Sequence, residues 1–217
     1  MLGLALESST YLGSVALLSG WQVMEEVRVP MRGEYEERMM PAVAALLDRA
    51  GVNPSDLGRI MCGDGPGSFT SLRVSAAIAK GLAHGLGRPL VVASSLLLVP
   101  AGAEPSLSPG LYSAVLDAMR GEVFGLDFSV GADGSIVPGD GTWLAPLEEV
   151  RARAAVSGRV LVGPGEQLKL EPAARGFARL GRYGLLREVD VMTWQPDYGR
   201  KAEAQVRWEA AHGRPLT

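Results

Sequence analysis

Two segments of the chain carry residue types that bind phosphate. In Glu7 to Thr10, an acid followed by three hydroxyl residues ends an apolar stretch, Leu2 to Glu7. An ATPase uses such an acid to hold magnesium-bound water, and it places such hydroxyls near phosphate oxygens. The same residues also suit a capped hairpin turn that binds nothing. The segment alone leaves both interpretations open.

The second segment is the glycine-rich run GDGPGSFT, from Gly63 to Thr70. Glycines between a strand and a helix let backbone N–H groups converge at the helix start, where the helix dipole favours an anion. They also permit a tight turn without any ligand, with Ser68 or Thr70 capping the helix. If a vestigial phosphate loop is present, we expect its residues to be the following: Glu7, Ser8, Ser9, Thr10, Gly65, Gly67 and Ser68.

Other nucleotide sites fit the chain poorly. No Gly-Lys-Ser/Thr follows the glycines, as a Walker A loop requires. A dinucleotide site needs an acid about 20 residues further on, whereas Ser71 to Ala103 contains no Asp or Glu. A matching second loop, Asp117 to Gly121, holds Met119 and Arg120 in place of glycine and threonine. A complete nucleotide clamp is therefore not expected.

Metal and nucleophile chemistry have no support in the sequence either. His84 and His212 are the only histidines, and no Cys, Asp or Glu stands at ligand spacing around them. No Gly-x-Ser-x-Gly elbow is present. Cys62 is the only cysteine, which excludes an intramolecular disulfide, and its apolar surroundings predict burial. We expect no catalytic residue, no metal site and no cofactor.

The elements that must position these segments follow from apolar periodicity and turn residues. The first half predicts strands at 2–7, 13–18, 22–29, 59–63 and 89–93, with helices at 35–50 and 72–85. The second half predicts strands at 111–117, 122–130, near 136 and at 160–162, with a helix at 146–156. Glycines and prolines beyond 163 interrupt every periodic window, so we predict no element there.

Both halves begin with an apolar strand that ends in an acid, Glu7 or Asp117, before a glycine opens the next strand. This order predicts an α/β protein with mixed sheets and two related lobes, the actin-like (ASKHA, ribonuclease H-like) architecture. We place the lobes at 1–100 and 101–217, the second with a tail. Residues 165–188 are few for a full repeat, so the second lobe is expected to be shortened.

The two helices of the first half have apolar faces with two interpretations. They can pack on the lobe's own sheet, or they can pair with a partner's helices. Small residues on the second helix leave more than one of its faces able to approach another helix closely. The expected partner interface comprises nine residues: Met39, Met40, Val43, Leu47, Val74, Ala77, Ile78, Gly81 and Leu82.

Composition limits the classes of partner. The net charge is −3 and the sequence pI about 5.5, so a broad basic surface for nucleic acid is not expected. Local basic residues occur near the C-terminal end, but Glu203 and Glu209 among them favour a solvated tail: Arg200, Lys201, Arg207 and Arg214. No apolar run spans a bilayer and no secretory signal is recognisable, so we expect a cytoplasmic protein without membrane contact.

Three stretches resemble the TsaB family, also called YeaZ. They are LALESST with GSVALL (4–10, 13–18), GPGSFTSLRV with AIAKGLA (65–74, 77–83), and AVLDAMRGEVF (114–124). PDYGRKAEA (196–204) is similar to the family's C-terminal Pro-x-Tyr-x-Arg segment. The GPGSFT stretch is also found in the family's catalytic relatives. The resemblance covers the chain best from Met1 to about Val130.

The resemblance implies a non-catalytic platform subunit of the machinery that makes threonylcarbamoyladenosine beside the tRNA anticodon. It implies docking of a TsaD-like catalytic subunit on the N-terminal helices, a TsaE-like ATPase in the assembly, and tRNA contact only through the complex. We expect a homodimer when the chain is isolated. The catalytic relatives carry metal-binding histidines near the first helix, where Glu34 to Met39 contains none.

Three positions depart from the family pattern. Serine stands at Ser71 and Ser75, where glycine is usual, and we expect the added volume to alter close helix packing. Glu7 stands where aspartate is usual. Two other functions remain as alternatives: a stand-alone actin-like ATPase or small-molecule kinase using Glu7 to Thr10, and a peptidase using Ser68, suggested by the family's distant glycoprotease kinship.

Overall fold

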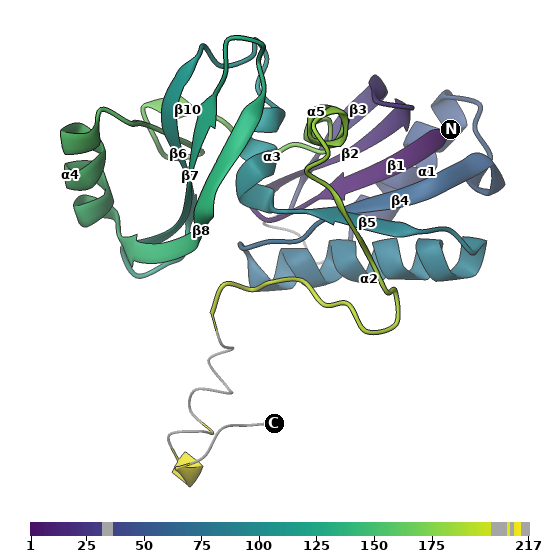
Figure 1. Ribbon diagram of the computed structural model, residues 1–217. Helices are drawn as coiled ribbons and strands as arrows, with labels where there is room; N and C mark the ends of the chain where they lie inside the picture. Colours follow the sequence, from purple (N-terminus) through teal and green to yellow (C-terminus); the bar gives the residue numbers. More distant parts are fainter. Residues whose placement is uncertain (32–36, 201–207, 209–210, 214–217) are drawn as a thin grey trace.

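The protein has two lobes, each built on a mixed sheet with helices packed against it (Figure 1). A computed structural model describes residues 1–31, 37–200, 208 and 211–213. Within these residues, every helix is too short or too polar to cross a membrane. The α/β class and the two-lobed actin-like architecture predicted from the sequence are confirmed.

The first sheet has the strand order β11-β5-β4-β1-β2-β3. Its central strand β1 runs antiparallel to β2 and parallel to β4. Leu4 and Leu6 point to one face of the sheet and Ala5 to the other, and all three side chains are fully buried. The strand bounds are β1 Leu2–Glu7, β2 Leu12–Ser19, β3 Gln22–Pro30, β4 Leu57–Gly63, β5 Leu90–Ala93 and β11 Arg187–Val189.

Helices α1 (Met39–Arg49) and α2 (Phe69–Leu86) cover the face that carries Leu4 and Leu6. The predicted ends of both helices are close to the observed ones, although residues 35–36 lie outside the described part of the chain. Gly87 ends α2 in the left-handed region (φ 62°), as expected for a helix that stops at glycine. A short 3₁₀ helix, η1 (Pro54–Asp56), leads into β4.

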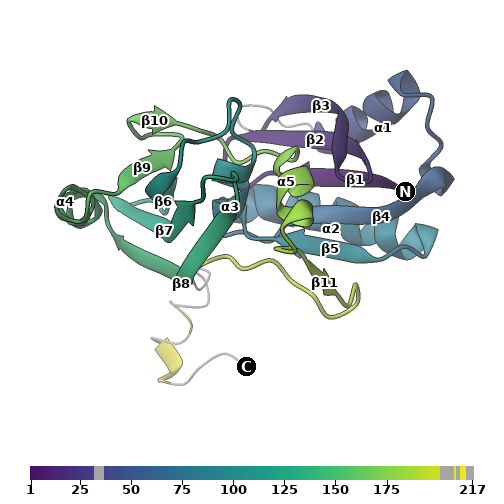
Figure 2. The same cartoon turned by 45° about the horizontal axis from the view of Figure 1, so that its top comes forward.

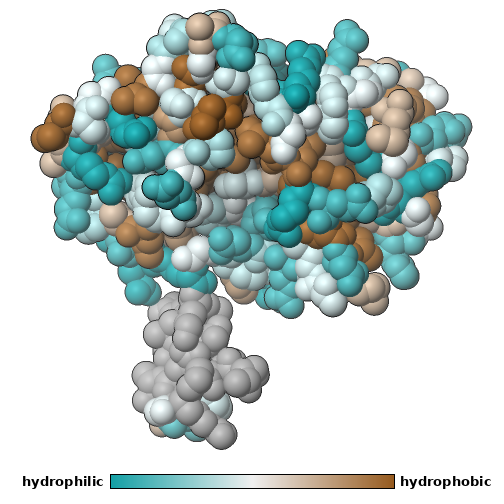
Figure 3. Space-filling model, in the orientation of Figure 1, coloured by the Kyte–Doolittle hydropathy of each residue, from teal (hydrophilic) through white to brown (hydrophobic). Residues whose placement is uncertain are grey.

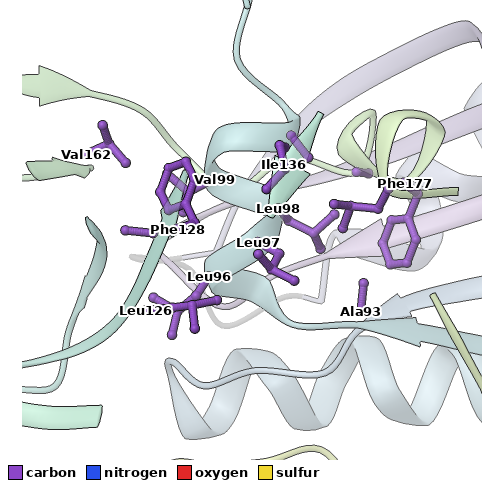
Figure 4. Close-up of a cluster of buried hydrophobic side chains, with 14 of the residues drawn as sticks. Ala93, Leu96, Leu97, Leu98, Val99, Leu126, Phe128, Ile136, Val162 and Phe177 are labelled. Atoms are coloured by element: carbon purple, nitrogen blue, oxygen red, sulfur yellow. The ribbon is translucent and has the colours of Figure 1, made fainter. Parts of the chain in front are cut away.

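The opposite face of the first sheet packs on α3 (Ser95–Ala101), which lies between the two lobes (Figure 4). Leu96 to Val99 contact strands of both sheets and Phe177 of α5 (Gly176–Arg182). Every residue of α3 is buried. A helix buried all round has no polar face and therefore no amphipathic period, so the sequence did not predict it.

The second sheet repeats the first with the order β10-β9-β6-β7-β8. Helix α4 (Leu147–Ser157) buries Val150 and Ala154 against it. Residues 164–167 alone connect β9 to β10, in the place where the first lobe has α2, so the second lobe is shortened as expected. The strand bounds are β6 Gly110–Asp117, β7 Glu122–Val130, β8 Ile136–Pro146, β9 Val160–Gly163 and β10 Leu168–Lys169.

The chain returns to the first lobe after β10. Helix α5 packs beside α3, and β11 pairs antiparallel with β5 at the edge of the first sheet (Figure 2). Trp21, in the β2–β3 turn, packs so closely on α5 that a Cβ at Gly181 would lie 2.3 Å from its ring. The boundary at residue 100 stays a prediction: β11 belongs to the first sheet, whereas α5 contacts both lobes, with Trp21 in the first and Gly134 in the second.

Candidate functional site

Glu7 ends β1 and is completely buried. The backbone N–H of Ser9 donates to Oε1 at 2.6 Å, and the Ser95 hydroxyl donates to Oε2 at 2.9 Å. Burial raises the pKa of the Glu7 carboxyl, and the hydrogen bonds from Ser9 and Ser95 offset this only in part. A Cβ at Gly63 would lie 1.9 Å from Oε2, so the carboxyl also fills the space beside β4.

The neighbouring Ser8 is bound to the start of α2. Its Oγ lies 2.8 Å from the Ser71 carbonyl oxygen and 2.7 Å from Ser75 Oγ. Both α2 serines are buried and face β1. The expectation that they alter packing between α2 and another helix is therefore wrong, because their added volume points into the lobe.

The glycine turn packs against the β1–β2 turn, backbone on backbone. The N–H of Ser68 donates to the Ser9 carbonyl at 2.7 Å, and a Cβ at Gly67 would lie 2.3 Å from the same oxygen. The Gly65 carbonyl accepts from the N–H of Ser95 at 2.8 Å. The structure thus brings together all seven residues of the expected phosphate loop, but the chain itself takes up the Ser9 and Ser68 N–H groups.

Residues 190–200, which we call the strap, cover the glycine turn. Asp64 anchors them: its carbonyl accepts from the Asp197 N–H at 2.7 Å, and its carboxylate accepts from Trp194 Nε1 at 2.9 Å and from Arg187 at 2.7 Å. A Cβ at Gly65 would lie 2.0 Å from the Asp197 carbonyl oxygen. A phosphate could reach this turn only after the strap had moved.

The matching turn of the second lobe is Asp117 to Gly121. Met119 and Arg120 both have left-handed backbone (φ 66° and 57°), and the Asp117 carboxylate accepts from the Met119 N–H at 2.7 Å. The Tyr11 hydroxyl lies 4.0 Å from Met119 Sδ. The β1–β2 turn of the first lobe and the β6–β7 turn of the second therefore face one another, as the duplicated architecture predicts. The side chains of Tyr11 and Met119 make the contact between them.

The nine residues of the expected partner interface divide into two groups. Met39, Val43 and Leu47 are buried in the core of the first lobe, because the apolar face of α1 packs on its own sheet. The prediction that these three residues belong to a partner interface is wrong, because their side chains are not exposed to a partner. The other six are exposed or half-buried on α1 and α2: Met40, Val74, Ala77, Ile78, Gly81 and Leu82.

The outward face of α2 carries a row of exposed residues spaced four apart, which we call the α2 row. It consists of Phe69, Arg73, Ala77, Gly81 and Gly85. A Cβ at Gly81 or Gly85 would meet nothing within 4 Å, so the backbone of α2 is accessible there. In the lower right of Figure 3, where Figure 1 places α2 and β5, hydrophobic (brown) residues lie among hydrophilic ones.

Phe69 and Arg73 belong to this row but were not among the expected interface residues. The Arg73 guanidinium lies 5.1 Å from the centroid of the Phe69 ring, and the Tyr198 ring of the strap lies 4.6 Å from the Phe69 ring. The four-residue spacing back from Ala77 points to both residues. Arg73 already lay within the helix predicted at 72–85, and Phe69 would have been included had the helix been predicted to begin there.

The remaining residues considered for metal binding, thiol chemistry or nucleic-acid contact do not form a common site in the described part of the chain. In the described part of the chain, no three His, Cys, Asp or Glu side chains lie together where they could hold a metal ion. Cys62 is buried as predicted, and burial raises the pKa of its thiol. In the basic C-terminal segment, Arg200 pairs with Glu122 at 3.0 Å, whereas Lys201, Arg207 and Arg214 lie outside the described residues.

Comparison with known proteins agrees with this architecture. Residues 31–140 match the family described as TsaD: tRNA N6-adenosine threonylcarbamoyltransferase. The tRNA threonylcarbamoyladenosine biosynthesis protein TsaB of Bacillus subtilis is 31% identical, over 94% of this chain and 96% of that protein. The TsaB of Escherichia coli is 32% identical over 60% of this chain and 56% of its own length.

Solved structures extend the likeness to the whole fold. YeaZ from Pseudomonas aeruginosa superposes with a TM-score of 0.75 at 27% identity, over 91% of this chain and 100% of the other. The match to the Bacillus subtilis protein and the superposition on YeaZ each cover more than nine-tenths of both chains, so these relatives have both lobes. The chain therefore belongs to the TsaB (YeaZ) family of tRNA threonylcarbamoyladenosine biosynthesis proteins.

Proposed function

We propose that this chain is a non-catalytic platform subunit that binds a TsaD-like catalytic subunit through the α2 row and the apolar residues beside it. The observation that carries the proposal is the open backbone of α2 at Gly81 and Gly85. The distance between two packed helices is set by the side chains at their contact. A row of Ala77, Gly81 and Gly85 therefore allows a partner helix to come close.

Apolar area beside the row supplies the driving force. Val74, Ile78 and Leu82 are half-buried, so each retains surface that a partner helix can cover. Met40 of α1 adds an exposed, adaptable side chain at 39% exposure. Arg73 and Phe69 at the start of α2 provide a charged and aromatic rim, which is common around apolar interface centres.

The condition of the phosphate loop supports a role without catalysis. Glu7 is committed to Ser9 and Ser95, and the strap covers the glycine turn. Ser68, the residue of the peptidase alternative, has its hydroxyl 3.0 Å from Ser71 Oγ, and no base contacts it in the described part of the chain. An activated serine would need such a base.

Family membership and charge complete the proposal. We infer that a TsaE-like ATPase joins the assembly and that tRNA is contacted through the complex, since the chain carries a net charge of −3. Because a helix face that fits one helix can fit its own copy, we expect the isolated chain to form a homodimer through the same row. We place the protein in the cytoplasm, where tRNA is modified.

The test is a single bulky substitution on the α2 row. Gly81→Arg adds a long side chain into open space on a helical residue, so it should fold and yet weaken binding of a TsaD-like protein by about 100-fold or more. Ala152→Arg on the exposed side of α4 is the matched control and should bind normally. Co-purification and light scattering measure both the heterodimer and the homodimer.

Equal binding by the wild type and Gly81→Arg would remove α2 from the interface. Failure of the wild type to bind any TsaD-like protein would reject the platform role itself. Saturable ATP binding by the isolated chain in calorimetry would instead favour the actin-like ATPase if Glu7→Gln weakens it, because that alternative places the nucleotide on Glu7 to Thr10.

A further inference from the structure

A hollow of about 300 Å³ lies at the junction of the two lobes, on residues that the proposed function does not use. Its walls are the loop after α3, the β7–β8 turn (residues 131–135) and α5, which Figure 2 shows beside α3. Arg175, Arg179 and Arg182 line it from α5 and the residue before that helix, together with Tyr183. Three guanidinium groups around one small hollow point to an anionic ligand.

The acids near the hollow already have partners. Glu104 forms an ion pair with Arg175, whose Nε also lies 2.5 Å from Oε2 of the buried Glu26. The Asp133 carboxylate accepts from the N–H and hydroxyl of Ser135, at 3.0 and 2.6 Å. Arg175 is thus neutralised, and Asp133 keeps its negative charge but forms no ion pair with either of the remaining two arginines.

Arg179 and Arg182 are held by neutral groups. Arg179 donates to the Gly134 carbonyl at 2.6 Å and to the Pro100 carbonyl at 3.4 Å, and Arg182 donates to the Trp21 carbonyl at 3.0 Å. Across residues 1–31 and 37–200, neither guanidinium has a carboxylate within 4.0 Å. Backbone carbonyls orient a guanidinium without cancelling its charge, so both groups keep their positive charge and free N–H donors.

Such an arrangement matches the chemistry of a phosphate group. A guanidinium offers a planar fork of N–H donors that binds phosphate oxygens in pairs, and a charge fixed in advance loses little entropy on binding. The volume of the hollow stands at the lower end of small-molecule sites, roughly 300 to 1,000 Å³. Gly134 of the second lobe and Val23 of the first both line the hollow, so the site would be built from both lobes.

We propose that this hollow binds a phosphate ester, with Arg179 and Arg182 as the groups that hold the phosphate. The ester is a nucleotide or the phosphorylated end of an RNA, which share this chemistry. Tyr183, whose hydroxyl donates to the Asp133 carbonyl at 3.2 Å, keeps the β7–β8 turn against α5 and so maintains the shape of the hollow.

The experiment uses the full chain at constant ionic strength. Inorganic phosphate, adenosine monophosphate and a short 5′-phosphorylated oligoribonucleotide are titrated in parallel by calorimetry. We expect saturable binding of at least one probe, weakened about tenfold by Arg182→Gln and by Arg179→Gln, the loss typical of one charged hydrogen bond. The probe that binds best identifies the source of the phosphate.

Arg88→Gln is the matched control. Arg88 is also exposed and donates to a carbonyl, that of Ser55 at 3.1 Å, but it lies away from the hollow. Because Arg182 is exposed and makes one such bond, Arg182→Gln should fold even if Arg179→Gln does not. Absence of binding by all three probes, or equal binding by the wild type and Arg182→Gln, would overturn the proposal.

Discussion

In the first lobe, β4 is followed by the glycine turn and the 18-residue helix α2, whereas in the second lobe residues 164–167 lead directly from β9 to β10. The strand orders β5-β4-β1-β2-β3 and β10-β9-β6-β7-β8 are otherwise equivalent. The sheets therefore define the common architecture, and the helices determine what each lobe can bind. The first lobe has an open helix face to offer, and the second has no counterpart of it.

The hairpin turns between the first two strands of each lobe differ in the same way. In the first lobe, Glu7 and Ser8 are buried and hydrogen-bonded to α2 and α3. In the second lobe, Asp117 and Met119 are exposed. A matching position in a duplicated fold thus says little about matching chemistry. The predictions below test this difference between the lobes, beginning with the largest expected effect.

The largest expected difference between the lobes is in the stability lost when a buried side chain of α1 or of α4 is shortened. Leu46→Ala on α1 removes a completely buried side chain and should lower the free energy of unfolding by about 2 to 5 kcal/mol. Val150→Ala on α4 removes fewer buried atoms and should cost about 1.6 kcal/mol. Urea denaturation followed by circular dichroism measures both, and equal costs would contradict the expectation that α1, with more buried residues than α4, contributes more to the core.

The next effect depends on pH. Burial raises the folded-state pKa of Glu7, so the protonated carboxyl stabilises the fold below the ordinary glutamate pKa of about 4.3, and this stabilisation is lost as pH rises through the folded-state value. Glu7→Gln, which keeps the shape, should gain stability relative to the wild type as pH increases. Denaturation series at several pH values measure the difference.

Asp117→Asn is the control for that series, since Asp117 is the corresponding acid of the second lobe and is exposed. Asparagine can still accept from the Met119 N–H, so this substitution removes the charge and keeps the turn of the second lobe. A parallel pH trend for Glu7→Gln and Asp117→Asn would show that burial of Glu7 is not its cause.

Turn substitutions should have the smallest effects, with opposite signs in the two lobes. Gly20→Ala forces alanine into left-handed backbone (φ 59°) without any steric contact and should cost about 1 kcal/mol. Met119→Gly relieves the same kind of strain (φ 66°) and should stabilise by roughly 0.5 kcal/mol. Thermal denaturation measures both, and destabilisation by Met119→Gly would mean that its contact with Tyr11 outweighs the strain.

The sequence predicts the elements of the first half well because the residues that end them lie next to them in the sequence. Gly51 and Gly87 follow the two helices, and apolar residues recur with the helix period between them. By contrast, α3 has no polar face, and α5 is short and bounded by glycines, so neither leaves a local signal. Their stability comes from packing between segments that are far apart in sequence.

The candidate site is harder to predict for a related reason. The apolar face of a helix has the same period whether it covers its own sheet or a partner, so Met39, Val43 and Leu47 could not be distinguished from Ile78 or Leu82. The covering of the glycine turn depends on Asp64 and Trp194, which are 130 residues apart. No local pattern contains that pairing, although PDYGR identified the segment.

The return of α5 and β11 to the first sheet makes the two lobes inseparable in practice. A fragment ending at residue 100 would lack the helix that covers Ala16 and Leu18, and it would leave β5 as a bare sheet edge. Such a fragment should aggregate and would therefore not represent the first lobe of the intact protein. The repeat seen in the two sheets is therefore a repeat of strand order and not of units that can fold alone.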